Sequence, residues 1–118
     1  MQYLILALED EQAFTARDDV ERGPAYWEAW TGYIAALTES GILANAGALQ
    51  APWTATTVRV RDGERLVQDG PYAETKEQLG GYFVVDVPDL DTALEWARRC
   101  PSAEYASAEV RPLLPMRA

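Results

Sequence analysis

The segment YFVVDVPDLDTALEWARRCP, residues 82–101, contains the signals of a β-strand that is followed directly by a helix. Residues 82–87 are aromatic or β-branched at all but one position, which is typical of a strand. Pro88 ends the strand, and Asp89 is a preferred residue at a helix N-cap. The spacing of the apolar residues then predicts a helix over 90–100. Its buried stripe would consist of Leu90, Ala93, Leu94 and Ala97.

The first half of the chain shows the same order of strand and helix. Residues 2–8 are apolar at nearly every position, which predicts a strand covered on both faces. Tryptophans and tyrosines at helical spacing predict a helix over 24–40. By their position, residues 42–50 are expected to form a second strand, and the alternation over 104–111 predicts a last strand.

Residues 55–69 predict a β-hairpin. Polar and apolar side chains alternate on both sides of Asp62-Gly63, a pair that favours a two-residue type I′ turn. The expected cross-strand pairs are Arg61 with Glu64, Arg59 with Leu66, and Val58 with Val67. One face of the hairpin would carry Val58, Val60 and Val67, and the other would be polar.

The 118 residues fit a single domain, 1–118. Without the hairpin, the predicted order is the α+β, ferredoxin-like βαββαβ pattern, in which both helices cover one face of an antiparallel sheet. The other face would be too apolar to stay exposed. We therefore predict a homodimer in which two sheets face each other as a dimeric α/β barrel-like assembly. The side between the sheets would carry Tyr3, Tyr82, Val84 and Asp86.

The composition excludes several classes of function. Ten basic and nineteen acidic residues give a net charge of −9, which disfavours direct binding to nucleic acid and to anionic membranes. Without His, the chain cannot build a Ser-His-Asp, Cys-His or histidine-ligated metal site, and we expect no metal and no other cofactor. The apolar runs are short, the N-terminus lacks a basic leader, and Cys100 is the only cysteine, so we expect a cytoplasmic protein.

Three residues are candidates for catalysis. Asp69 precedes a Gly-Pro pair and is either an acid, base or ligand-binding carboxylate, or the residue that shapes the turn. Lys76, the only lysine, either holds an anionic group or pairs with nearby glutamates. Asp86 interrupts an apolar strand, so it lines a wet cleft between subunits, pairs with an arginine such as Arg111, or lies at the exposed end of the strand.

Other polar and aromatic side chains are candidates for a ligand pocket. The dense polar stretch 74–77 is typical of a functional loop and equally of a capped helical turn. Gly80 and its neighbour lack the spacing of a phosphate loop, and a close backbone approach or a β-bulge explains them better. Trp27 and Trp30 are expected in the core. The expected pocket residues are Tyr3, Tyr72, Glu74, Thr75 and Tyr82.

Three stretches resemble a known family: ATTVRVRDG (55–63), DGPYAETKEQLGGY (69–82) and VPDLD (87–91). They closely resemble the DGPF branch of the YCII-related family, although Tyr72 stands where the name of the branch has Phe. The resemblance implies a ferredoxin-like dimer. Some family members carry a His–Asp pair, which this chain without His cannot have. Bacterial members often occur with sigma factors of the extracytoplasmic-function type, which implies a regulatory partner by association.

The sequence supports three hypotheses about the function. The leading one is a homodimeric small-molecule-binding or accessory module in bacterial regulation. The second is a cofactor-free enzyme on a small polar or carbonyl substrate, with Asp69 or Asp86 as the base and Lys76 as the electrostatic stabiliser. The third is a non-catalytic partner of an extracytoplasmic-function sigma factor that binds no ligand.

Overall fold

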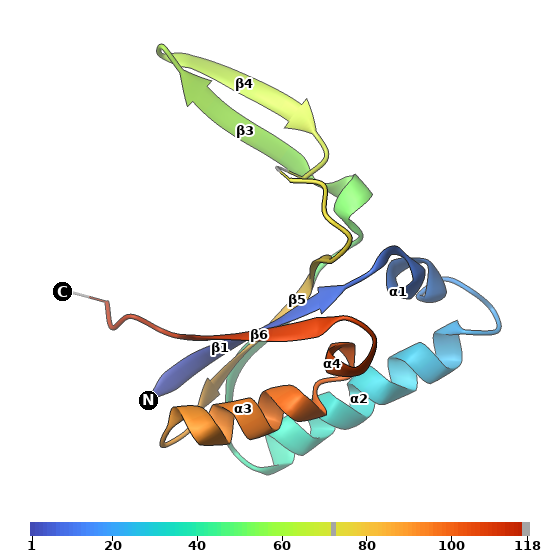
Figure 1. Ribbon diagram of the computed structural model, residues 1–118, viewed down its shortest axis with the longest axis vertical. Coiled ribbons are helices and arrows are strands. Elements are labelled where there is room, and N and C mark those ends of the chain that lie inside the picture. Colours follow the sequence, from blue (N-terminus) through green and yellow to red (C-terminus); the bar gives the residue numbers. More distant parts are fainter. Residues whose placement is uncertain (72, 117–118) are drawn as a thin grey trace.

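A computed structural model describes residues 1–71 and 73–116 and shows a mixed α+β fold built on one four-stranded antiparallel sheet (Figure 1). The strands lie in the order β2-β5-β1-β6, with β5 and β1 at the centre. The bounds of the strands are Gln2–Glu9 for β1, Leu43–Ala48 for β2, Gln78–Asp86 for β5 and Ser107–Pro112 for β6. The α+β class that the sequence predicts is confirmed.

Two long helices, α2 (Gly23–Glu39) and α3 (Leu90–Arg99), cover one face of the sheet (Figure 1). The bounds of both agree with the prediction to within a residue or two at each end. The predicted buried stripe of α3 is confirmed for Ala93 and Ala97 and is wrong for Leu90 and Leu94, which are exposed. Asp89 caps α3 as expected, because its carboxylate accepts a hydrogen bond from the backbone N–H of Thr92 at 2.9 Å. Among the residues that the structure describes, no helix is long and apolar enough to cross a membrane.

Two short helices complete the fold. The sequence leaves residues 9–23 open as a long connection or a frayed helix, and the structure has the short helix α1 there, whereas α4 was not foreseen. In α1 (Glu11–Ala16), the side chain of Asp10 accepts a hydrogen bond from the N–H of Ala13 at 2.9 Å and caps the first turn. The four residues of α4 (Ser102–Tyr105) occupy the start of the stretch 104–111, so the last strand is shorter than predicted. A single helical turn is too short to leave a periodic signal in the sequence.

The core lies between the two long helices and the sheet. Trp30 of α2 stacks on Phe83 of β5 with ring centroids 5.9 Å apart, and Tyr33 meets the same ring edge-on at 5.2 Å. Ile5 of β1 and Leu37 of α2 are completely buried beside them. This aromatic cluster fixes α2 against the centre of the sheet.

The prediction that Tyr3 lies on the face of the sheet without helices is wrong. Tyr3 lies opposite Val85 in the antiparallel register, and directly opposed residues share a face of the sheet. Tyr3 is therefore only 3% exposed in the core under the helices, rather than on the outer side of the sheet. The face without helices, which we call the open face, carries Leu4, Leu6, Leu8, Tyr82 and Val84, with Asp86 at its end.

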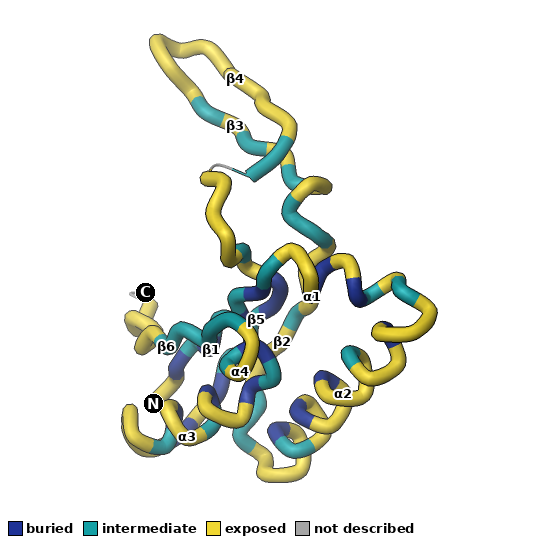
Figure 2. Tube along the Cα trace, turned by 45° about the vertical axis from the view of Figure 1, so that its right-hand side comes forward, coloured by how far each residue is buried: buried dark blue, intermediate teal, exposed yellow. Residues whose placement is uncertain are grey.

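The predicted hairpin is a two-stranded arm, β3 (Thr56–Arg61) and β4 (Glu64–Asp69). We call residues 56–69 the arm. The three predicted pairs, Arg61–Glu64, Arg59–Leu66 and Val58–Val67, are all confirmed by the register. Asp62 and Gly63 have φ angles of 52° and 79°, as a type I′ turn requires. The arm points away from α2 and α3 and is exposed over most of its length (Figures 1 and 2).

Gly80 forms a β-bulge in β5, one of the two explanations that the sequence suggested. Ala7 pairs with Gly81 and Leu8 with Leu79, so Gly80 has no partner of its own on β1. A Cβ atom at Gly80 would lie 2.2 Å from Oε1 of Glu9, which is far inside van der Waals contact. Glycine is therefore required here by the close approach of the Glu9 carboxylate.

We predict opposite effects for two Gly→Ala substitutions. Gly80→Ala should lower the free energy of unfolding by about 1–3 kcal/mol, because Glu9 must move out of its hydrogen bonds. Gly32→Ala, on α2 with nothing near its Cβ position, should raise it by about 0.5–1 kcal/mol through helix propensity. Urea denaturation measures both, and equal effects would contradict the steric role of Gly80.

Candidate functional site

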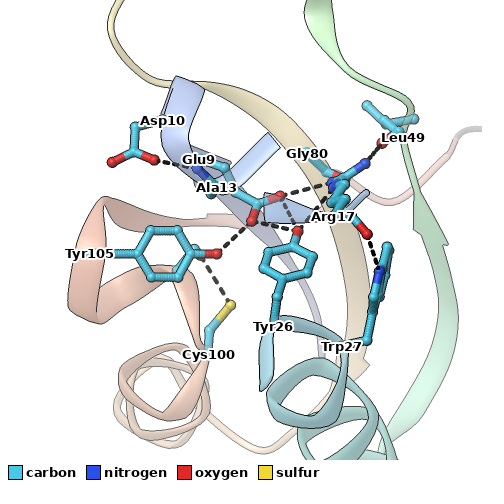
Figure 3. Close-up of polar contacts among 11 residues, drawn as sticks. Glu9, Asp10, Ala13, Arg17, Tyr26, Trp27, Leu49, Gly80, Cys100 and Tyr105 are labelled. Atoms are coloured by element: carbon cyan, nitrogen blue, oxygen red, sulfur yellow. Dashed lines mark hydrogen bonds and ion pairs between the residues drawn. The ribbon is translucent and has the colours of Figure 1, made fainter. Parts of the chain in front are cut away.

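A buried carboxylate, Glu9, lies at the centre of the candidate site. Glu9 is the last residue of β1 and is in phase with the core residues of that strand, so its side chain points under the helices. It is only 1% exposed. Isolation of a carboxylate from water costs several kcal/mol unless charged or hydrogen-bonding groups compensate for it. Three side chains, which come from three other segments of the chain, do so here (Figure 3).

Arg17, directly after α1, provides the opposite charge. Its Nη2 lies 2.9 Å from Oε1 of Glu9 and also donates to the carbonyl of Gly80 at 3.2 Å. Nη1 donates to the carbonyl of Leu49, and Nε donates to the hydroxyl of Tyr26 at 3.0 Å. Burial lowers the pKa of Arg17, but the hydrogen bonds to Tyr26 and Glu9 outweigh it and the pKa is raised. The guanidinium therefore stays charged and held in place.

Two tyrosine hydroxyls complete the shell of Glu9. Tyr26 of α2 donates to Oε1 at 2.9 Å and to Oε2 at 2.7 Å, and Tyr105 of α4 donates to Oε2. Burial, and then the hydrogen bond to Glu9, raise the pKa of each tyrosine above its ordinary value of 10. Both hydroxyls are therefore protonated donors at neutral pH. We call Glu9, Arg17, Tyr26 and Tyr105 the Glu9 cluster.

A cavity of about 230 Å³ lies next to the cluster, between α2 and the β2–β5 edge of the sheet. Arg17 and Tyr26 form its polar wall. The other walls are apolar or small and include Trp27, Trp30, Ile34, Ala46 and Phe83. The volume is just below the roughly 300 Å³ at which typical ligand pockets begin, so the cavity suits a compound with one ring.

The polar wall has one hydrogen-bond donor that its contacts to described residues leave unused. A guanidinium has five N–H groups, and the contacts of Arg17 to described residues use four of them. The fifth is on Nη1.

Trp27 is 42% exposed at the cavity and donates its indole N–H to the carbonyl of Arg17 at 3.1 Å. The expectation of a core position thus holds for Trp30, which is buried, and is wrong for Trp27.

The three candidate catalytic residues lie apart from this cavity. Asp69 is exposed at the end of the arm. Asp86 is exposed at the end of β5, one of its three predicted placements, and forms an ion pair with the amino group of Met1 at 2.9 Å. Arg111 pairs with Glu109 instead. Lys76 lines a separate open depression.

The candidate pocket residues are also dispersed. Glu74 and Thr75 share with Lys76 the open depression of about 670 Å³, which Trp53 and the start of α1 also line. Tyr82 lies on the open face with its ring against Gly47, whereas Tyr3 is in the core. Tyr72 lies outside the described residues. These side chains do not form one site, and their roles remain predictions.

Sequence reasoning missed the Glu9 cluster. One signal was available, because Glu9 continues the alternation of Tyr3, Ile5 and Ala7 and so falls on the buried face. Its partners leave no pattern, since Arg17, Tyr26 and Tyr105 meet only in the folded chain. Among the described residues, no group of three or more acidic or Cys side chains is arranged to hold a metal ion.

We predict that Tyr105→Phe destabilises the protein more than Tyr33→Phe. Tyr105 donates to a buried carboxylate, a bond worth about 1.5–3 kcal/mol, whereas Tyr33 donates to the carbonyl of Trp96 at 2.9 Å, a neutral bond worth about 0.5–1.5 kcal/mol. Urea denaturation of both variants measures the difference. A smaller loss for Tyr105→Phe would show that Glu9 does not depend on this donor.

We also predict a loss of stability at alkaline pH. Burial raises the pKa of Tyr26, Tyr33 and Tyr105 in the folded protein above the value of 10 that they have when unfolded. The stabilisation is therefore complete below pH 10 and is lost as the pH rises above it. Denaturant titrations across this range should show the fall, and Tyr33→Phe should reduce its slope. A flat profile would argue against buried hydroxyls.

The fold of this chain is similar to that of a known enzyme. The solved structure of 5-chloro-2-hydroxyhydroquinone dehydrochlorinase from Burkholderia phenoliruptrix AC1100, in complex with 2,5-dihydroxybenzoquinone, is similar in fold. Its TM-score is 0.55 at 14% sequence identity, over 97% of this chain and 94% of that chain. This likeness supports the architecture alone.

Sequence comparison gives the family. An uncharacterised protein of Rhizobium meliloti (strain 1021) is 37% identical over 117 residues, which are 96% of this chain and 92% of that protein. The model of the YCII-related domain matches residues 1–117. The DGPF branch remains a prediction, whereas the resemblance to the wider family is confirmed, and the chain belongs to the YCII-related family.

Proposed function

We propose that this protein binds a small planar compound with one oxygen-bearing ring in the cavity beside the Glu9 cluster. The observation that carries the proposal is a cavity with aromatic walls whose single polar side contains a largely buried, charged guanidinium. Fixed polar groups at the side of an apolar cavity orient a ligand. Arg17 and Tyr26 are such groups here.

The walls favour a planar ligand over an aliphatic one. Trp27, Trp30 and Phe83 contribute aromatic atoms to the walls, which suit contact with a ring. The remaining N–H of Arg17 can donate to a carbonyl, phenolate or carboxylate oxygen at the edge of the ring. The ligand of the structurally similar dehydrochlorinase, 2,5-dihydroxybenzoquinone, has this chemistry and is therefore a suitable first probe.

A cofactor-free enzyme on a carbonyl substrate is the second candidate function. The observation in its favour is that Tyr26, protonated at neutral pH, lies in the cavity wall between Glu9 and Arg17. The single hydroxyl proton of Tyr26 is directed at Glu9, so in this role the hydroxyl would turn to donate to a substrate oxygen. The charge of Arg17 would stabilise negative charge that develops on that oxygen. Arg17 would then take the role that the sequence analysis gave to Lys76.

The protein works, in this proposal, as a homodimer through the open face. The strand order β2-β5-β1-β6, with both long helices on one side of the sheet, supports a ferredoxin-like arrangement. The other side carries three leucines, Tyr82 and Val84, an apolar surface that a second sheet would cover as in a dimeric α/β barrel. The sigma-factor partner and the cytoplasmic location remain predictions from the sequence.

A titration tests the binding function. We expect 2,5-dihydroxybenzoquinone to bind the wild-type protein in isothermal titration calorimetry. Ala46→Phe fills the cavity from the exposed strand β2 and should weaken binding at least about tenfold. Ala35→Phe adds the same ring to an exposed part of α2 and is the matched control, with unchanged affinity.

Two outcomes would contradict the binding proposal. One is the absence of binding for a panel of single-ring quinones, hydroquinones and benzoates; the other is an Ala46→Phe protein that binds as tightly as the control. Mass spectrometry of the recovered compound separates the two functions. An unchanged compound supports a binding module, whereas conversion that Tyr26→Phe abolishes supports the enzyme.

A further inference from the structure

We propose that the arm, residues 56–69, is a clasp that packs against a second copy of this chain. The inference rests on the proposed homodimer and extends it, because the open face alone does not involve the arm. The arm would hold the partner through the face that carries Val58, Val60 and Val67. Four observations support this role.

First, the described part of the chain leaves the arm uncovered. Val58, Val60 and Val67 are 56%, 61% and 53% exposed, and they lie together on one face of the hairpin. An isolated two-stranded hairpin is marginally stable at best in water, and it normally needs packing against another element. A hairpin with three exposed valines on one face is therefore expected to pack against a partner.

Second, the arm lies on the side of the sheet where a second copy would bind. It points away from the helices, to the side of the sheet on which the open face lies (Figures 1 and 2). A molecule seated on Leu4, Leu6 and Val84 of the open face would lie beside the arm. In a two-fold dimer the contact occurs twice, since each arm reaches the other copy.

Third, the arm adds no net charge that an acidic second copy would repel. The arm holds three arginines and three acidic residues, so the full net charge of −9 belongs to the rest of the chain. Arg65 lies opposite Val60 and thus shares the valine face. Asp69 lies opposite Thr56 on the same face, so this face carries one charge of each sign. A neutral face with exposed valines can pack against an acidic chain without like-charge repulsion, and it does not suit nucleic acid.

Fourth, the arm is built as a separable element. The N–H of Gly70 donates to the carbonyl of Ala55 at 2.6 Å, so the two ends of the hairpin meet at its base. The four-stranded sheet is complete without β3 and β4. Such an arm can reach a neighbouring molecule without any change in the sheet.

Excision of the arm tests the proposal. In the test variant, two glycines replace residues 56–69 and join Ala55 to Gly70. Sedimentation equilibrium should show wild-type particles of twice 13.1 kDa at micromolar concentration. The excised variant should dissociate at least about tenfold more readily, which corresponds to about 1.4 kcal/mol. Circular dichroism checks that the sheet and helices are retained.

Point variants keep the proposal falsifiable if the excised chain fails to fold. Val58→Thr, Val60→Thr and Val67→Thr together keep a β-branched shape and strand propensity but make the face polar. This triple variant should also weaken the dimer at least about tenfold. Leu66→Thr changes an apolar residue on the opposite face of the hairpin and is the control, with unchanged dimerisation.

The outcomes separate the proposals from each other. A wild-type dimer that neither arm variant weakens would overturn the clasp, while the dimer through the open face would stand. A wild-type chain that is monomeric at micromolar concentration would overturn both. Ligand binding in the cavity is measured independently and would be affected by neither result.

Discussion

The ion pair between Glu9 and Arg17 is the constraint on which the rest of the site depends. A carboxylate that water cannot reach must be matched by protein groups, and the loss of one partner of a buried pair costs about 3–5 kcal/mol. The partners of Glu9 come from the α1–α2 connection, α2 and α4. The pair thus holds together segments that are distant in the sequence.

The same constraint shapes the cavity. Because Arg17 also binds the carbonyls of Leu49 and Gly80, it ties the polar wall to the end of β2 and to the bulge in β5. Gly80 has no side chain because the carboxylate occupies that space. The polar side of the cavity is therefore preorganised before any ligand arrives, which favours recognition of a rigid, planar molecule.

The sequence predicts local features better than long-range ones. The arm follows from Asp62-Gly63 and from alternation, down to its register, and the two long helices follow from their apolar spacing. Tyr3 was assigned to the wrong face because the register between β1 and β5 decides which residues of the two strands share a face, and the sequence does not give that register. The Glu9 cluster escaped prediction because no spacing along the chain relates Arg17 to Tyr105, which meet through tertiary packing alone.

The closed base of the arm has a consequence for how this protein can diverge. Since Ala55 and Gly70 already meet, the length and sequence of the intervening loop are free of the constraints that govern the sheet. Insertions, deletions and substitutions there would leave the buried carboxylate and its neighbours untouched. The hairpin can therefore change in evolution independently of the cavity and its polar wall, so that relatives with the same interior could differ in their binding partners.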